Sequence, residues 1–567
     1  MHPILSALKY LCLVLLVATG VACSSDQPTP GGGEYDPDNT QATFLQITLG
    51  RPDISRAGNP TGGETGDGMQ VGINHENDIH TLALFIYEDN EGRSLNNNPS
   101  TPFVSKVYLN ESALAAAKLP LSSNPYSITY KFKVSKFEPA ATQRIAVVVN
   151  ANENISEVND LGTLRTFILD ESVKQQNRIA DSDWFVMANA FTTDGNINLP
   201  AGVTDPDLIG TESHPLVGEV SVERLTARID LFTDSKAKFD SENSTNGYYR
   251  EGNGYLDPDN YKFNGQSVIR YPVYERNAAG NYVKSAEVRL THVLPVNVMQ
   301  HPSFAFKHVT AGTDIPADIL SLNVCGNENM VNGTPTNYVV EPRTASKASV
   351  TVPADWFGST AAMALTPASF TDDNSVGAMA ARWSRGTCSD DPNTDYAILT
   401  YANENTQHKD VLRTDILTGL ALRALYVPSK VYGDAALTEV AAYIPGTDLW
   451  RMSPTSLTVS DADCVYFNNE AAANAFAAAN PQLKAIVSMI PKGICYYNIW
   501  IRHARNSDAD PQRIPMEYGI VRNNIYQLKL TFHGPGSQKI IEREPEYVST
   551  RIFVRRWNFI RHPEIIM

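Results

Sequence analysis

Short runs of residues rich in Val, Ile, Tyr, Phe and Thr recur along the chain, and clusters of Asn, Asp, Gly and Pro separate them. Runs of this kind are typical of β-strands, and the clusters between them are typical of turns. We predict strands at residues 44–49, 81–87, 127–134, 144–149, 184–188, 220–231, 286–294, 396–401, 422–427, 493–501, 524–532 and 548–554.

Helical patterns are few, and we predict helices only at residues 161–169 and at the Ala-rich residues 470–479. Many short strands with few helices favour an all-β fold of β-sandwiches over a parallel α/β sheet. With 567 residues, the chain is long enough for more than one domain. We expect two sandwiches, with their boundary in the loop at residues 199–215 and an irregular elaboration of the second domain at residues 297–393.

A segment suited to proteolysis follows the first predicted strand. The aliphatic face of that strand is formed by Leu45, Ile47 and Leu49. Residues 51–60 then contain the Gly, Pro, Asn and Asp of an exposed loop, where cleavage concentrates. Because Pro52 lacks an N–H and constrains the bond after Arg51, an arginine-specific protease should cleave the unprotected bond between Arg56 and Ala57.

The last predicted strand also alternates, and the chain stays apolar to its end. The apolar side chains of this tail are Val548, Ile552, Val554, Trp557, Phe559, Ile565 and Ile566. Chain ends are usually polar and frayed, so an apolar tail needs a groove that buries it. The preceding residues 533–547 reach up to roughly 50 Å when extended, far enough to enter the same domain or another molecule.

Together the two ends predict assembly by strand exchange. Cleavage after Arg56 would remove the first strand and open a groove with unpaired backbone and apolar pockets. The tail of a second subunit could fill this groove by β-augmentation. Such a contact joins a tail to a groove, so it propagates into a filament instead of closing a dimer. The alternative is that the final strand only completes its own sheet.

The first residues predict export and lipid attachment. Lys9 precedes an apolar run at residues 10–17, and small residues lead to Cys23, as in a bacterial signal peptide with a lipid-modified cysteine. The alternative is a plain secretory signal with an incidental cysteine. Residues 24–39 carry Pro, Gly and Asp and read as a spacer between the lipid and the fold. No other stretch is long and apolar enough for a membrane helix.

Composition and motifs exclude several classes of protein. The formal net charge of −16 argues against nucleic-acid binding, and no catalytic or nucleotide-binding motif is present, so we expect neither an enzyme nor a cofactor. We also expect no metal site, because His301 and His308 lack neighbouring ligands and the Asp-rich residues 257–260 are more typical of an Asx-turn than of a calcium loop. The remaining cysteines could form two disulfides or stay as buried thiols: Cys325, Cys388, Cys464 and Cys495.

Several motifs resemble those of the Bacteroidota fimbrillins, the subunits of type V pili, and especially the Mfa-type stalk subunits. They are Cys23 with its spacer, residues 55–58 (Ser-Arg-Ala-Gly), residues 222–228 (V-E-R-L-T-A-R), residues 496–500 (Y-Y-N-I-W), residues 521–526 (V-R-N-N-I-Y) and residues 554–557 (V-R-R-W). The resemblance extends over essentially the whole chain and is weakest at residues 297–393.

The resemblance implies two transthyretin-like β-sandwich domains with a few short helices and a C-terminal donor-strand tail. It implies a signal peptide at residues 1–22 and a lipid-anchored spacer and propeptide strand at residues 23–56. The N-terminal domain would follow at residues 57–215, the C-terminal domain at residues 216–536 and the tail at residues 537–567. The displaced strand would carry Leu45, Ile47 and Leu49.

The function implied is that of a structural subunit of a cell-surface fimbrium that supports adhesion. The precursor would be an outer-membrane lipoprotein at Cys23 and the product an extracellular polymer. Its partners would be copies of itself, accessory subunits, an arginine-specific protease and a host or bacterial surface receptor. The alternatives are a tip or accessory adhesin of the same system and a surface glycan-binding lipoprotein.

Overall fold

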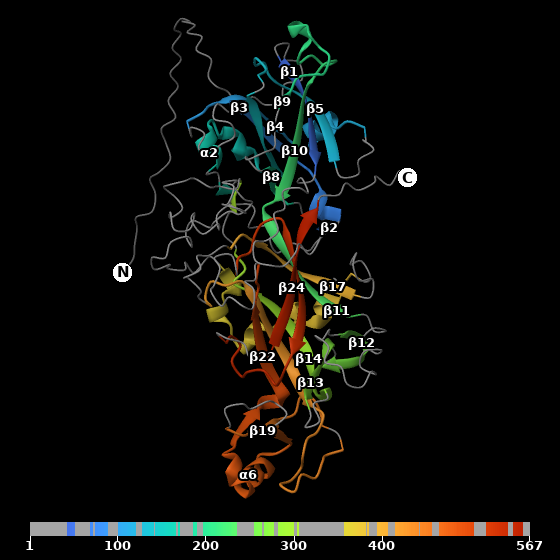
Figure 1. Ribbon diagram of the computed structural model, residues 1–567, viewed down its shortest axis with the longest axis vertical. Coiled ribbons are helices and arrows are strands. Elements are labelled where there is room, and N and C mark those ends of the chain that lie inside the picture. The colour runs from blue at the N-terminus through green and yellow to red at the C-terminus, as the bar shows by residue number, and fades with distance from the viewer. Residues whose placement is uncertain are drawn as a thin grey trace, which may run out of the picture.

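The structure is a computed structural model. It describes residues 42–50, 69–71, 74–88, 100–120, 127–140, 142–165, 168–169, 185–189, 197–234, 255–263, 266–276, 282–299, 303–305, 357–380, 383–384, 394–405, 414–441, 443–455, 464–503, 518–542 and 548–558. These residues form an elongated molecule with the first domain, the second domain and a small distal sheet arranged along its long axis (Figure 1).

The N-terminal domain is a single curved sheet with the order β4-β3-β6-β8-β10-β1-β5, and β9 pairs beside β10. Its strands are β1 (Ala42–Gly50), β3 (Leu82–Glu88), β4 (Phe103–Leu109), β5 (Ser127–Ser135), β6 (Gln143–Val149), β8 (Met187–Asn189), β9 (Ile197–Asn198) and β10 (Leu216–Arg224). The first half of β10 pairs with β1 and its last residues pair with β8. Because β10 belongs to both halves, the sheet folds over one shared core that draws on β1, β3, β5, β6 and β10.

The C-terminal domain is a sandwich of two sheets. The six-stranded sheet has the order β16 (Trp383–Ser384), β17 (Thr394–Asn403), β11 (Thr226–Asp234), β23 (Asn524–Phe532), β24 (Val548–Asn558) and β2 (Met69–Val71). The five-stranded sheet has the order β12 (Tyr255–Phe263), β13 (Gln266–Arg276), β14 (Tyr282–Val296), β18 (Gly419–Pro428) and β22 (Ile494–Trp500). Strand β2 lies in sequence between β1 and β3 of the first domain but belongs to the second domain's sheet.

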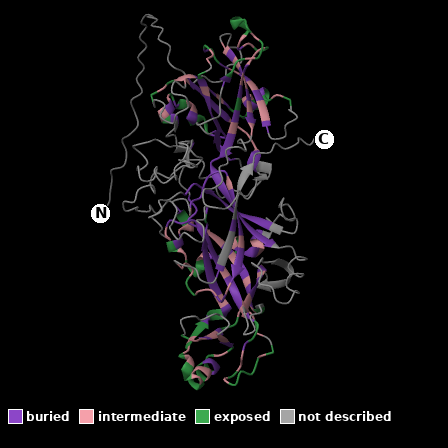
Figure 2. Cartoon of the chain, in the orientation of Figure 1, coloured by how far each residue is buried: buried purple, intermediate pink, exposed green. Residues whose placement is uncertain are grey.

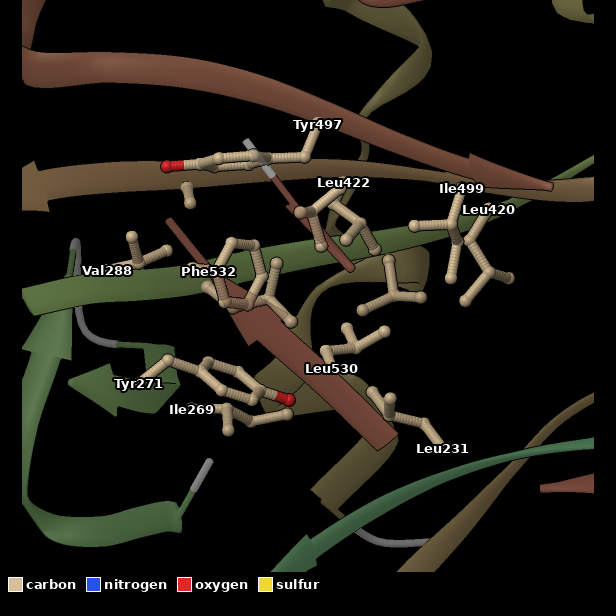
Figure 3. Close-up of a cluster of buried hydrophobic side chains, with 14 of the residues drawn as sticks. Leu231, Ile269, Tyr271, Val288, Leu420, Leu422, Tyr497, Ile499, Leu530 and Phe532 are labelled. Atoms are coloured by element: carbon tan, nitrogen blue, oxygen red, sulfur yellow. The ribbon is translucent and has the colours of Figure 1, made fainter. Parts of the chain in front are cut away.

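Apolar side chains from both sheets fill the space between them (Figure 3). Much of the described part of these two sheets is buried (Figure 2). Leu528 and Leu530 of β23 are fully buried, and the ring of Phe532 meets the rings of Tyr271 and Tyr497 edge-on with centroids 4.7 Å apart. Burying a side chain of this size contributes about 1.5–3 kcal/mol. The wall of the core next to the C-terminal strand is therefore formed mainly by β23.

A distal sheet extends the second domain at the end opposite the first domain (Figure 1). It comprises β20 (Val465–Phe467), β19 (Leu449–Ser453) and β21 (Ile486–Ile490), and it packs against α6 (Glu470–Ala479). The side chain of Asn469 accepts a hydrogen bond from the N–H of Ala472 and caps the helix, which explains why the Ala-rich run begins there. The predicted helix at residues 470–479 is confirmed.

The remaining elements are short. They are β7 (Ile168–Leu169), β15 (Ser303–Phe304), α1 (Glu111–Ala117), α2 (Leu161–Arg165) and α5 (Val376–Ala380). The predicted helix at residues 161–169 is thus shorter than expected, because residues 168–169 form a strand. The predicted all-β fold is confirmed. No helix in the described part of the chain is long and apolar enough to cross a membrane.

Two local expectations differ from the structure. Strands β10 and β11 follow each other with only Leu225 between them, so the chain changes domain there and not in residues 199–215, which connect two strands of the first domain. Residues 257–260 lie within β12, in the stretch between Asp257 and Lys262 where its pairing with β13 is interrupted. The composition of both segments is typical of loops, but pairing with distant strands determines where the domain boundary lies and that residues 257–260 belong to a strand.

A buried carboxylate on β14 makes the stability of the second domain pH-dependent. Glu287 accepts hydrogen bonds from Arg270, Lys284 and Arg289 at 2.6–3.1 Å. Burial alone would raise its pKa, but the hydrogen bond from Arg270 and the charges of Lys284 and Arg270 hold the pKa at about 2. Because the folded pKa is lowered, this stabilisation is present above the ordinary pKa of 4.5 and is lost as the pH falls towards 2.

We predict that Glu287→Gln removes this dependence. Between pH 5 and pH 2.5, the natural protein should lose about 2 kcal/mol more unfolding free energy than the variant. Urea unfolding at both pH values measures the difference. Glu157→Gln, which removes an exposed carboxylate, is the control. Equal acid sensitivity of Glu287→Gln and the natural protein would contradict the prediction.

Candidate assembly site

The first strand is built into the core of the N-terminal domain. Strand β1 pairs antiparallel with β5 along its whole length and parallel with β10 from Leu45 to Gly50. Its side chains alternate between intermediate and buried, as expected for period-two packing. The exposed fractions of Leu45, Ile47 and Leu49 are all 0%. Removal of β1 would therefore expose an apolar slot with an unpaired backbone edge on each side.

Contacts outside the sheet also fix β1. The N–H of Phe44 donates to the carbonyl oxygen of Gly210 at 2.8 Å, which joins the start of the strand to the loop before β10. The hydroxyls of Thr48 and Thr129 are 3.0 Å apart and form a hydrogen bond to β5. At its other end, Gly50 pairs with Ser221, near the point where β10 approaches the second domain. Strand β1 thus spans the domain up to the side that faces the junction.

The C-terminal strand lies in its own domain in the single chain. Strand β24 pairs antiparallel with β23 over Val548 to Arg556, and Val548 and Ile552 join the second domain's core with 7% and 8% of their surface exposed. On its other edge, β24 pairs among the described strands only with β2, through residues Arg556 to Asn558. The final strand therefore completes its own sheet here, which is the alternative that the sequence left open, but most of its outer edge has no partner strand in the described part of the chain.

The segment before β24 is attached to β22. Tyr496 and Ser537 exchange backbone hydrogen bonds at 2.8 and 2.9 Å, and Asn498 bonds both backbone groups of Glu542 at 2.8 and 2.9 Å. Gly536 has a φ of +66°, and a Cβ there would lie 2.7 Å from the carbonyl oxygen of Tyr496, so only glycine fits. The connection that could extend with the tail is therefore residues 543–547 instead of residues 533–547.

The motif at residues 222–228 lies where the two domains meet. Nε of Arg224 donates to the carbonyl oxygen of Glu76 at 2.8 Å, and its Nη2 donates to the side chain of Asn77. Arg228 donates bidentately to Asp230 at 3.0 and 2.8 Å and through Nη1 to both oxygens of Glu76 at 3.1 and 3.2 Å. The side chains of Arg228 and Glu76 are fully buried. These contacts hold the short 3₁₀ turn Asn74–Asn77 against β11.

Burial shapes the protonation of this ionic cluster. Although burial acts to lower it, the charges of Asp230 and Glu76 hold the pKa of Arg228 well above its ordinary value. Burial and the neighbouring Glu76 raise the pKa of Tyr401, whose hydroxyl donates to Oε1 of Glu76 at 2.6 Å. Desolvation lowers the pKa of Arg224 to about 10, so its guanidinium stays charged at neutral pH. The cluster thus ties β10, β11 and β17 to a segment that precedes the first domain's β3.

The motif at residues 521–526 (V-R-N-N-I-Y) contacts the same junction between the domains. The side chain of Asn523 accepts a hydrogen bond from the N–H of Arg224 at 3.2 Å, and its own N–H donates to the carbonyl oxygen of Thr226 at 2.9 Å. Asn523 has a φ of 57°, a left-handed conformation that asparagine tolerates. Nη2 of Arg522 donates to buried Glu404 at 2.7 Å. The sequence marked both arginine motifs but gave no signal for Glu76, one acidic residue among many.

The other residues expected from the sequence fall into three groups. Val554 and Trp557 are placed only as backbone members of β24. Sγ of Cys464 lies 3.3 Å from Nε of Arg451, and Cys495 is a buried thiol whose pKa burial raises to about 12. Outside the described residues lie Cys23, Arg56, Ala57, His301, His308, Cys325, Cys388, Phe559, Ile565 and Ile566. Within the described residues, no group of three or more His, Cys, Asp or Glu side chains could hold a metal ion.

Residues 490–562 match the family model described as major fimbrial subunit protein type IV, fimbrillin, C-terminal. This region contains β22, β23, β24 and the Tyr-rich, V-R-N-N-I-Y and V-R-R-W motifs. The resemblance to the fimbrillins is confirmed. No curated protein matches the chain at a significant level.

Solved structures of fimbrial and cell adhesion proteins are also similar to the chain. The tip fimbrial protein Mfa3 from Porphyromonas gingivalis shares 10% identity, with a TM-score of 0.33 and coverage of 91% of this chain and 100% of that one. A fimbrilin (FimA) from Porphyromonas gingivalis W83 shares 11% identity, with a TM-score of 0.37 and coverage of 92% of this chain and 99% of that one. A putative cell adhesion protein from Parabacteroides distasonis ATCC 8503 shares 13% identity, with a TM-score of 0.36 and coverage of 91% of this chain and 99% of that one. Because these TM-scores are low, the fimbrillin assignment rests on residues 490–562.

We predict that Arg228→Ala destabilises this fimbrillin-like protein by about 3–5 kcal/mol, because it leaves the carboxylates of Glu76 and Asp230 buried without their cation. Lys131→Ala, which breaks an exposed pair with Glu212 at 3.7 Å, should cost less than about 1 kcal/mol and is the control. Urea unfolding of both variants measures the difference. Equal losses would show that the junction does not depend on the cluster.

Proposed function

We propose that the chain is a structural subunit of a cell-surface fimbrium that polymerises by donor-strand exchange. One observation carries the proposal: β1 is paired on both edges and one of its faces is fully buried, yet it lies on the N-terminal side of the segment that holds the predicted cleavage bond Arg56–Ala57. A strand this deeply built into the core leaves a vacant slot if it is removed. Loss of three fully buried aliphatic side chains would cost about 4–9 kcal/mol, which favours the entry of a replacement strand.

The C-terminal strand is suited to be that replacement. In its own domain, β24 pairs with β23 from Val548 to Arg556 but with β2 only at its last three residues. In the slot of another copy it would have β5 on one edge and β10 on the other, over most of its length. The apolar residues Val548 and Ile552 share one face and could occupy alternate pockets left by β1. The slot would thus offer β24 more backbone pairing than it has in its own domain.

The exchange gives the polymer a direction. Each subunit would offer one slot in its first domain and one strand in its second, at different places along the elongated molecule (Figure 1). Such a heterologous contact repeats without closing, so the product is a filament. The attachment of Glu542 to β22 would fix the point from which the tail extends.

The precursor would be exported as a lipoprotein attached at Cys23 to the outer membrane, with its acyl chains and β1 on the same N-terminal segment. Cleavage by an arginine-specific protease at Arg56–Ala57 would then release the lipid and the strand together. The mature subunits would form an extracellular fimbrium with accessory subunits and support adhesion to a receptor. This role requires no catalytic site. A tip or accessory adhesin is the second candidate, since one of the similar structures is a tip protein.

The experiment is to treat the purified precursor with an arginine-specific protease and to look for detergent-resistant ladders on unheated gels. We predict ladders for the natural protein and for Arg51→Ala. We predict no cleavage at the site and no ladders for Arg56→Ala. A variant lacking residues 548–567 should be cleaved but stay monomeric.

Two results would contradict the proposal. Ladders that survive deletion of residues 548–567 would show that the tail is not the donor. A cleaved natural protein that remains monomeric would indicate a subunit that does not polymerise by itself. Size-exclusion chromatography of the uncleaved deletion variant confirms that it is folded before digestion.

A further inference from the structure

Strand β2 occupies an unusual place in the chain. It pairs in parallel with β24, in the register Met69 with Arg556, Gln70 with Trp557 and Val71 with Asn558, and it is the edge strand of the six-stranded sheet. In sequence it lies after the predicted cleavage bond and shortly before Glu76, whose side chain is fully buried in the junction. A cut at Arg56–Ala57 would therefore leave β2 attached to the mature subunit.

The position of this pairing on β24 is significant for strand release. The chain before β24 is fixed to β22 through Ser537 and Glu542, which keeps the start of β24 close to its own sheet. Peeling of β24 from β23 is therefore expected to start at its far end, near Asn558. This is the end that β2 contacts, while the outer edge of β24 from Val548 to Arg555 pairs with no other strand in the described part of the chain.

We infer that β2 holds the free end of β24 and controls how fast the C-terminal strand leaves its own domain. Each backbone hydrogen bond between the two strands must break before peeling can start, so their loss raises the population of the open state. Because β2 remains after cleavage, loss of β1 opens the slot without also releasing the tail. The tail then leaves only when a neighbouring slot competes for it, which restrains exchange to the wrong partner.

The biological use of this restraint rests on the proposed strand exchange, but the restraint itself is a property of the single chain. It is therefore measurable in the intact, uncleaved protein. Amide hydrogen exchange reports the opening of β24 directly, because its backbone N–H groups exchange only when they are released.

Two single substitutions form a matched pair. In a parallel pair, alternate residues of a strand direct their N–H groups to the neighbour, so only one of Met69 and Gln70 donates to β24. Proline at that residue removes the hydrogen bond, whereas proline at the other, with its N–H on the open edge, is tolerated. We expect one of Met69→Pro and Gln70→Pro to speed exchange in residues 548–558 about fivefold, and the other to have little effect.

Peptides from β1 show whether each variant is folded, because their exchange should not change. A second variant, which lacks residues 556–567, tests the contact from the other side: exchange at Met69–Val71 should become faster. Unchanged exchange in residues 548–558 in both proline variants would overturn the inference, as would unchanged exchange of β2 in the deletion variant.

Polymerisation separates this inference from the proposed function. After arginine-specific cleavage, the proline variant with faster exchange should form ladders about fivefold faster than the other. Faster exchange without ladders in any version, the natural protein included, would support the role of β2 and reject self-polymerisation. Ladders that form at equal rates, with equal exchange, would support polymerisation and reject the role of β2.

Discussion

The double-sided pairing of β1 inside a closed core is the constraint on which this account depends. A strand at a sheet edge can leave and expose little, but β1 lies between β5 and β10 and contributes three side chains with no exposed surface. Its removal leaves backbone N–H and C=O groups without hydrogen-bond partners and exposes apolar pockets to water, and both raise the free energy of the domain. The N-terminal domain therefore needs a strand in this position at all times, either its own or one from another molecule.

Strand β2 and the end of β24 meet near the junction of the domains. The buried cluster of Glu76, Arg224 and Arg228 fixes the segment that follows β2, and β2 in turn contacts the end of β24 (Figure 1). The strand that the proposed cleavage would remove buries three side chains completely, whereas most of the outer edge of β24 has no partner strand in the described part of the chain. This arrangement separates opening of the acceptor from release of the donor.

Much of the fold was predictable because β-strands with one buried face alternate in sequence. Each predicted strand overlaps an observed one, although residues 220–231 belong to two strands, β10 and β11, in different sheets. The aliphatic face of Leu45, Ile47 and Leu49 is the buried face of β1. The three-residue β2 was not predictable, since it lacks a pattern and exists only through pairing with distant residues. The partnership of Glu76 with Arg228 was equally hidden, because a buried ion pair depends on the tertiary fold. Loop composition misplaced the domain boundary, since β10 and β11 are almost continuous.

The most direct test is a disulfide cross-link between two differently marked copies, in a background with the native cysteines replaced by alanine. One copy carries Lys131→Cys on β5, opposite Gln46 of β1, and the other carries a cysteine at Ser549, Arg551 or Phe553 of β24. The account predicts cross-linked dimers of the two copies only after arginine-specific cleavage. Absence of cross-links at all three positions after cleavage, or equal cross-linking without it, would contradict the replacement of β1 by a neighbour's β24.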